Sequence, residues 1–195
     1  MINIGRIVTI IFFIAMSVSC SKNSLNVFTD DNNRLAWLIA QEKLFRQNSN
    51  PFNKPEVGGN NAKLPNLTPE NLKANHDRLS AIYAKLKTIN ETNLSEANKV
   101  NLSVLSYNVK NRLDSFVNKE HYMPLTAESG FHVWISNINS KIKMTSVQDY
   151  RDYISRMKAI PLYFEQQMAW MNKGIQSGIT QPKIVLEGFE QSIKA

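Results

Sequence analysis

Apolar side chains recur at helical spacing along most of this chain, and this pattern constrains the fold more than any other feature. One helix is predicted to start after Thr68, which suits the N-cap, with Pro69 at the first helical position and Glu70 in the first turn. Ser95 and Glu96 start a second helix after a short polar stretch, so the two helices are expected to pack as an antiparallel pair. Their apolar stripes are Leu72, Leu79, Ile82, Tyr83, Leu86 and Ile89, and Leu102, Leu105, Val109, Leu113 and Phe116. The sequence therefore predicts a mainly α-helical fold, a helical array with antiparallel helix pairs.

Helices are also predicted on both sides of this pair. The first covers 31–47, and proline and glycine over 48–66 then indicate a loop. The apolar residues 131–135 fit a strand and a buried helical turn equally well, because periodicity cannot separate the two over so short a run. Residues 180–182 open a last helix, and no helix-terminating residue follows Ile193. The chain is therefore expected to be cut short, either as the product of a truncated gene or as a fragment of a longer protein.

The longest predicted helix begins at Ser146, with Asp149 at the capping-box position. Pro161 is expected to kink or split it, because proline lacks a backbone donor and clashes with the preceding turn. Gly174 and Gly178 are expected to end it. Its apolar stripe is Tyr150, Tyr153, Ile154, Met157, Ile160, Phe164, Met168 and Met171. At helical spacing, the methionines of this stripe suit a core better than a ligand-binding surface.

The N-terminus has the three parts of an export signal. Arg6 provides the positive region, residues 7–16 form an apolar run, and residues 17–19 are small. The apolar run is shorter than the roughly 20 residues that a membrane-spanning helix needs. We therefore predict a signal peptide over 1–19 and an exported protein.

Cys20, the only cysteine, directly follows this signal. Its position resembles the bacterial lipobox, in which the cysteine is diacylated, although Ser17 stands where the lipobox usually has Leu or Val. An ordinary cleaved signal and an uncleaved anchor are the alternatives. Two acyl chains, such as palmitate, are sufficient for stable membrane anchoring. We predict lipidation at Cys20, a lipid-anchored tether over 20–30 and a location in the bacterial cell envelope, outside the cytoplasm.

Charge excludes one class of partner. Without residues 1–19, which contain Arg6, 22 basic residues stand against 16 acidic ones. These charges are scattered singly and form no basic stripe with interleaved aromatic residues, so a nucleic-acid partner is not expected. The membrane, reached through Cys20, is the partner that the sequence predicts.

No residue cluster carries recognisable chemistry by itself. None of the three histidines, His76, His121 and His132, stands at a metal-ligand spacing such as i, i+4 on a helix from another histidine, a cysteine or a carboxylate. The sequence also lacks an H-E-x-x-H motif, a nucleophile elbow and a phosphate-binding loop. We therefore predict neither a catalytic residue nor a metal or cofactor site in this chain. His76 is expected to be packed or half-exposed, and His132 to line a core or a pocket.

One block of the second half is more specific than the rest. Its segments are Gly130-Phe131-His132, S-V-Q-D-Y-R-D-Y (146–153), R-M-K-A-I-P (156–161), T-Q-P (180–182) and V-L-E-G (185–188). Together with L-P-N-L-T-P-E (64–70), they resemble the N-terminal half of the bacterial family catalogued as domain of unknown function 885. The resemblance runs from about residue 30 to the end of the chain and is strongest over 130–190.

The resemblance carries expectations about function. Members of that family are mostly helical, are often exported lipoproteins, and resemble zinc metallopeptidases with an H-E-x-x-H motif, in which two histidines hold zinc and the glutamate activates water. It therefore implies that 31–195 is the N-terminal part of a larger α-helical metallopeptidase-like fold and is inactive alone. Zinc and a peptide substrate are implied only for a full-length member. By their place in the block, five residues are implied to line a cleft: Phe131, His132, Trp134, Pro182 and Glu187.

The sequence is compatible with three hypotheses about function. In the first, the chain is the N-terminal part of an exported metallopeptidase-like lipoprotein and has no activity of its own. In the second, it is a stand-alone helical lipoprotein that acts as a binding or scaffold module. In the third, it is the product of a frameshift or an early stop, without a function of its own.

Overall fold

The computed structural model describes residues 30–51, 62–126, 128–138, 142 and 144–194. These residues form α-helices, short 3-10 turns and connecting loops, and the β-pairing among them is an isolated bridge between Leu125 and Gly130. The mainly α-helical fold is therefore confirmed. Cys20 and the predicted signal peptide lie outside the described residues, and they stay predictions.

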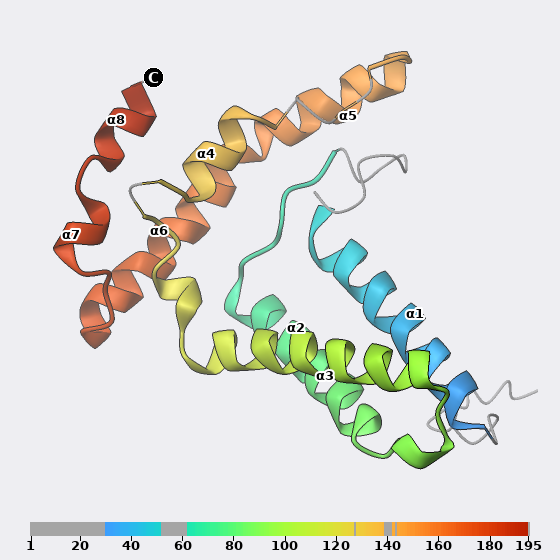
Figure 1. Cartoon of the computed structure of the whole chain (residues 1–195). Helices are drawn as coiled ribbons and strands as arrows, with labels where there is room; N and C mark the ends of the chain where they lie inside the picture. Colours follow the sequence, from blue (N-terminus) through green and yellow to red (C-terminus); the bar gives the residue numbers. More distant parts are fainter. Residues whose placement is uncertain (1–29, 52–61, 127, 139–141, 143, 195) are drawn as a thin grey trace, which may run out of the picture.

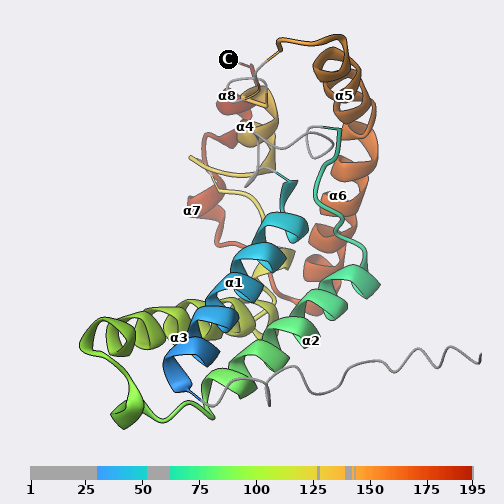
Figure 2. The ribbon, with the colours of Figure 1, turned by 90° about the vertical axis from the view of Figure 1, so that its right-hand side faces the viewer.

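Three helices form the first of two helical units. They are α1 (Asp31–Ser49), α2 (Pro69–Leu86) and α3 (Glu96–Val117), and the 3-10 turn Glu91–Asn93 lies between the last two. Figures 1 and 2 show α2 and α3 packed together and running in opposite directions, as the antiparallel pair predicted from the sequence. Helix α1 contacts both of them.

Side-chain caps set where these three helices begin. Oxygen atoms of Asp30, Thr68 and Ser95 accept hydrogen bonds from backbone N–H groups of the first turns of α1, α2 and α3. The apolar faces of the helices then meet in one core, in which Leu35 and Leu38 of α1 are fully buried. The other buried members of this core are Phe45, Leu79, Ile82, Leu86, Ile89, Leu94, Leu102 and Val109.

The second unit follows α3 and contains five helices among the described residues. They are α4 (Phe131–Ser136), α5 (Val147–Lys158), α6 (Ile160–Ser177), α7 (Lys183–Leu186) and α8 (Phe189–Lys194). The 3-10 turn Glu120–Tyr122 lies between α3 and this unit (Figure 1). Helix α4 settles the structure of 131–135, which is helical and not a strand.

The break between α5 and α6 lies where proline chemistry places it. Ser146 and Asp149 form the predicted capping box at the start of α5. Helix α5 then ends at Lys158, and Pro161 occupies the first turn of α6, where its missing N–H group costs no hydrogen bond. The predicted split at this proline is confirmed.

One helix boundary predicted from glycine was wrong, and another boundary was missed. Gly178, in the left-handed conformation with φ of 69°, does end α6, but the helix passes through Gly174 without interruption. The predicted last helix is two short ones, because Gly188 with φ of 86° separates α7 from α8. Tertiary packing, described below, explains why position 174 is a glycine.

The predicted core stripe of the longest helix is also wrong for much of its length. On α5 the buried side chains are Asp152 and Arg156, whereas Tyr150, Ile154 and Met157 are exposed. On α6, Met168 is exposed as well. Periodicity identified the helix correctly, but the apolar face of α5 is turned away from the rest of the described protein.

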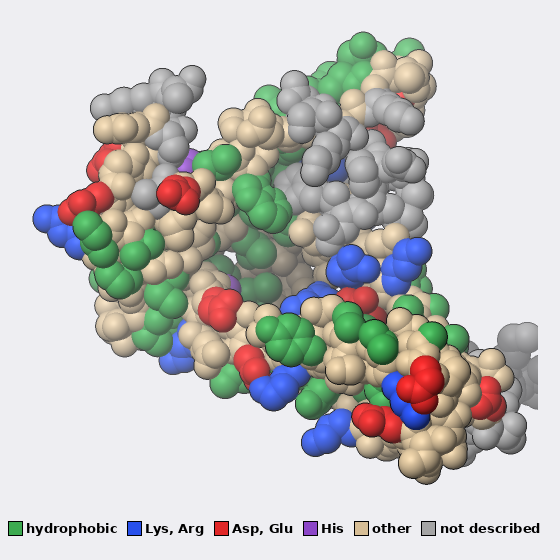
Figure 3. All heavy atoms as spheres, in the orientation of Figure 1, with side chains coloured by type: hydrophobic (Ala, Val, Ile, Leu, Met, Phe, Trp, Pro, Cys, Tyr) green, Lys and Arg blue, Asp and Glu red, His purple; other side chains and the backbone are tan. Residues whose placement is uncertain are grey.

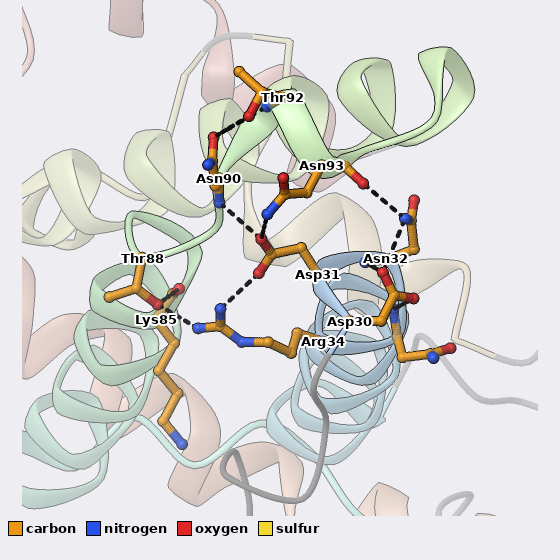
Figure 4. A network of polar contacts seen from close by, with 10 residues as sticks. Asp30, Asp31, Asn32, Arg34, Lys85, Thr88, Asn90, Thr92 and Asn93 are labelled. Atoms are coloured by element: carbon orange, nitrogen blue, oxygen red, sulfur yellow. Dashed lines mark hydrogen bonds and ion pairs between the residues drawn. The ribbon is translucent and has the colours of Figure 1, made fainter.

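A buried carboxylate joins the start of α1 to the turn between α2 and α3 (Figure 4). Asp31 is 8 % exposed and forms an ion pair with Arg34 at 2.6 Å. It also accepts hydrogen bonds from Asn93 Nδ2 at 2.9 Å and from the backbone N–H of Asn90 at 3.4 Å. The bond from Asn93 is the main reason why the pKa of Asp31 is below its ordinary value.

Among the described helices, none is both long and apolar enough to cross a membrane.

Candidate functional site

Three of the five residues predicted to line a cleft lie on α4, and two of these, Phe131 and His132, pack together. Phe131 is buried and packs edge to face against Phe164 of α6, with ring centroids 4.9 Å apart. The ring of His132 lies 6.1 Å from that of Phe131. The preceding Gly130 leaves room for this arrangement, since a Cβ atom there would lie 2.7 Å from Leu125 Cδ2 and 2.9 Å from His132 Nδ1. The G-F-H segment is therefore a tightly packed corner.

The other three predicted residues lie apart from this corner or at its surface. Trp134 is 55 % exposed. Pro182 is the N-cap of α7, Glu187 is its C-cap, and both are exposed. None of the five lines the pocket described below. Their role as cleft lining stays a prediction.

A cluster of aromatic and imidazole rings instead forms where the two helical units meet. Its five members, called the aromatic cluster below, are His76 of α2, Phe116 of α3, His121 and Tyr122 of the 3-10 turn, and Trp170 of α6. The centroid of Phe116 lies 4.6 Å from that of His76 and 5.4 Å from that of His121. On its other side, His121 meets Trp170 edge to face at 4.6 Å. The cluster thus runs from α2 to α6.

A sharp turn after α3 positions the middle of this cluster. Lys119 has a φ of 59°, a left-handed conformation that is uncommon for a side chain of this size, and it changes the direction of the chain after α3. Tyr122 then packs against α6 at Gly174, where a Cβ atom would lie 3.2 Å from Tyr122 Cβ and 2.6 Å from the carbonyl oxygen of Ile179. Gly174 is therefore needed for close packing and does not end the helix.

Hydrogen bonds attach α6 to the segment that precedes α2. Trp170 donates from Nε1 to the carbonyl oxygen of Leu67 at 2.6 Å. The backbone N–H of Leu67 donates to Gln166 Oε1 at 2.9 Å. Because both polar groups of Leu67 bond to one face of α6, the start of α2 and the middle of α6 are held in register.

A pocket of about 250 Å³ opens beside the aromatic cluster, between α2, the end of α3 and the 3-10 turn. It is called the His76–His121 pocket below. Its lining is largely apolar and carries a few polar groups, as ligand pockets in proteins generally do. The lining residues are Leu72, Asn75, His76, Leu79, Arg112, Ser115, Phe116, Glu120 and His121.

Burial and nearby cations control the charge of this pocket. The pKa of His121 is below its ordinary value, first because the ring is buried and then because Lys173 and Lys119 repel a positive charge. Arg112 donates to Glu42 Oε1 at 2.8 Å, and burial lowers the pKa of its guanidinium while Glu42 opposes that shift. At neutral pH the imidazole of His121 is therefore uncharged and offers one hydrogen-bond donor and one acceptor.

The arrangement suits binding better than catalysis. The pocket combines an apolar floor with imidazole, amide, hydroxyl, guanidinium and carboxylate groups, and its hydroxyl, that of Ser115, makes no hydrogen bond to His76 or His121 that would pair a nucleophile with a base. Among the described residues, no three histidine, cysteine, aspartate or glutamate side chains are placed to hold a metal ion. The expected lack of a cofactor in this chain stays a prediction.

Sequence reasoning did not find this site. His76, Phe116, His121 and Trp170 are spread over almost a hundred positions, and no spacing rule connects them. His76 lies in the pocket wall and is half-buried, as expected from its place beside the stripe of α2. The available signal was the cluster of E-H-Y residues directly after a helix end, which is where binding residues often occur.

Comparison with known proteins places the chain in a family. The sequence model described as "Bacterial protein of unknown function (DUF885)" matches residues 51–195. No curated protein and no solved structure matches the chain. Because the match covers most of its length, the chain belongs to the DUF885 family, as its second-half motifs indicated.

Proposed function

We propose that this member of the DUF885 family is the N-terminal helical part of an exported lipoprotein related to zinc metallopeptidases. In this proposal, the chain is inactive alone and contributes a binding wall for a peptide substrate, whereas the catalytic zinc belongs to residues outside this sequence. The observation that carries the proposal is the His76–His121 pocket, a largely apolar pocket with a few polar groups and no aligned catalytic group.

The pocket chemistry supports a peptide as the ligand. Leu72, Leu79 and Phe116 give an apolar surface, and a volume of about 250 Å³ accommodates one large apolar side chain. Asn75 and the neutral imidazole of His121 offer donors and acceptors for a peptide backbone. We therefore expect a peptide with an exposed phenylalanine or leucine to bind there.

The assignment of zinc to another part of the protein rests on the sequence. No H-E-x-x-H motif occurs in the 195 residues. A peptidase zinc site needs three protein ligands and an open position for water. The full chain is expected to contain no stoichiometric zinc in metal analysis, and one equivalent of zinc per chain would contradict the proposal.

Peptide binding can be tested with matched variants. The probe is a fluorescently labelled tetrapeptide with a central phenylalanine, and fluorescence polarisation gives its dissociation constant for the full chain. Leu72→Glu places a charge in the pocket wall and should weaken binding at least tenfold. Val100→Glu, at a 62 % exposed position on α3 away from the pocket, is the control and should bind normally. Equal affinities for the two variants would overturn this site.

The lipid anchor is tested separately. Cells fed labelled palmitate should incorporate the label into this chain, and Cys20→Ser should abolish the incorporation. Retention of the label in the Cys20→Ser variant would exclude acylation at this position. Export is measured in the same cells with added protease, after the outer layers of the cell envelope have been permeabilised. An exported chain should then be degraded.

A second candidate function is favoured by one observation. The three-helix core of α1, α2 and α3 is well packed, with Leu35 and Leu38 fully buried, which suits a stand-alone helical lipoprotein acting as a binding or scaffold module. Reading the DNA downstream of codon 195 in all frames separates the two. A continuation with H-E-x-x-H supports the metallopeptidase-like protein, whereas its absence together with a cooperative thermal melt supports the module.

A further inference from the structure

Helices α5 and α6 form one nearly continuous rod. The backbone N–H of Ala159 donates to Ser155 at 3.2 Å, and that of Tyr163 donates to Ala159 at 3.1 Å, so the helical hydrogen bonds continue across the break at Pro161. Figures 1 and 2 both show the two helices end to end. At 1.5 Å per residue, the rod is about 45 Å long.

On α5, polar side chains are buried and apolar side chains are exposed. The buried side chains of α5 are Asp152 and Arg156, whereas α6 buries Tyr163 and Trp170 together with Gln167. The opposite face of α5 carries apolar side chains, and Figure 3 shows such side chains at the surface over α5, at the upper right. An amphipathic helix normally buries its apolar face, so this orientation indicates that the exposed face has a partner.

The exposed side chains follow a seven-residue repeat. They are separated by three and four residues in alternation, and six of them are between 44 % and 70 % exposed: Val147, Tyr150, Ile154, Met157, Met168 and Ile175. Pro161, Phe164 and Met171 complete the same register. An apolar repeat of this period is the pattern that packs against another α-helix as a coiled coil.

We propose that this face, called the α5–α6 stripe, pairs with the α5–α6 stripe of a second copy of the chain in antiparallel orientation. With the two-fold axis near Ala159, Ile154 of one copy lies opposite Phe164 of the other, and Val147 lies opposite Met171. Both relations repeat on the other side of the axis, because a two-fold interface makes every contact twice. Eight of the nine positions of the repeat then face apolar partners in four mutual pairs, and Ile175 lies beyond the paired segment.

Charge supports this register and orientation. Beside the stripe, on its solvent side, Arg151 and Lys158 lie on α5 and Glu165 lies on α6, and all three are exposed. Antiparallel pairing about Ala159 brings Arg151 of each copy close to Glu165 of the other, which is the kind of flanking ion pair that sets helix orientation. The unfavourable element is Lys158, since the two copies of this side chain approach each other near the axis.

Cross-linking in intact cells tests the pairing on the protein as it exists. Lys158→Cys places a thiol near the two-fold axis, and mild oxidation should produce a disulfide-linked dimer on a non-reducing gel. Lys110→Cys, at an exposed position on α3, is the matched control, and the unsubstituted chain with Cys20 gives the background. A Lys158→Cys signal no greater than that of the control would overturn the proposal.

Charge exchange tests the orientation. Arg151→Glu and Glu165→Arg should each weaken dimerisation of the purified full chain by roughly fivefold, because each breaks two symmetric pairs. The double variant R151E/E165R should restore it, and Lys158→Gln should strengthen it. Failure of the double variant to recover would exclude the antiparallel register.

A variant in the centre of the stripe separates loss of pairing from loss of folding. Ile154→Lys should abolish the dimer in sedimentation experiments, whereas Val104→Lys, at a 53 % exposed position on α3, should not. Both variants should keep the helical circular dichroism signal of the native chain. A native chain that is monomeric, or that cross-links only to another protein, would show that the stripe has a different occupant and would overturn self-pairing.

Discussion

The ring of His121 lies edge to face against the ring of Trp170, with centroids 4.6 Å apart, and this contact joins the two helical units of the protein. His121 comes from the 3-10 turn after α3, and Trp170 comes from the middle of α6. Trp170 also bonds to Leu67 before α2, so a single aromatic side chain contacts both the beginning and the end of the α2–α3 pair. The joint between the units is therefore built from rings and is sensitive to their charge.

Stability should fall in mild acid because of His121. Its folded-state pKa is below 6.5, so the unfolded chain binds a proton more readily than the folded one. Above about pH 6.5, the titration of His121 does not change the stability of the fold. As the pH falls through that value towards the folded-state pKa, stability is lost. Thermal melts between pH 8 and pH 5 should show this loss, and His121→Phe should reduce it. An identical pH dependence in the two proteins would contradict the assignment.

Gly174→Ala should loosen the same joint. The added Cβ atom would meet the carbonyl oxygen of Ile179 at 2.6 Å, and a backbone atom cannot move aside cheaply. We expect a loss of about 1–3 kcal/mol in the free energy of unfolding, measured by urea denaturation. Gln176→Ala, exposed on the same helix, should change it by less than about 0.5 kcal/mol. Comparable losses in both variants would argue against the close contact.

Leu38→Ala should strongly destabilise the first unit. Leu38 is fully buried in the core between α1, α2 and α3, so truncation removes buried apolar surface and leaves a cavity. A loss of about 2–5 kcal/mol is expected in chemical denaturation. Leu44→Ala on the same helix is the control, because Leu44 is 44 % exposed, and it should cost far less. The prediction fails if the two truncations are equivalent.

Asp31→Asn should weaken the attachment of α1 to the α2–α3 turn. The substitution removes the negative charge that pairs with Arg34. It also replaces one carboxylate oxygen, and Asn93 and Asn90 both donate to such an oxygen. We expect a loss of about 1 kcal/mol or more in the free energy of unfolding. Because the pKa of Asp31 is lowered, its contribution is present above pH 3.8 and is lost as the pH falls through the folded pKa. Asp77→Asn, in an exposed ion pair with Lys73, is the control and should not measurably change the melt at neutral pH.

Local chemistry predicted where the long helices begin. Thr68, Ser95 and Ser146 cap helices as predicted, and Pro161 divides α5 from α6, because these effects depend on neighbours within four residues. Glycine was less informative. Gly178 ends α6 through its own left-handed backbone, whereas Gly174 is required by Tyr122 and Ile179, which come from other parts of the chain.

The candidate site could not be predicted from sequence patterns, because it too depends on residues from distant parts of the chain. Phe131, His132, Trp134, Pro182 and Glu187 share a block of sequence, but the structure packs Phe131 and His132 into a corner and leaves Trp134 at the surface. The His76–His121 pocket joins residues of α2, α3 and the 3-10 turn, and their proximity is produced by helix packing.

The sequence by itself determined the helical class, the start of each long helix, the division at Pro161 and membership of the DUF885 family. Capping, proline geometry and apolar periodicity are local, so they act before any tertiary contact forms. Tertiary structure alone decided which face of each helix is buried. On α5 it buried Asp152 and Arg156 and exposed Ile154 and Met157, because the face a helix buries depends on which surfaces its neighbours offer.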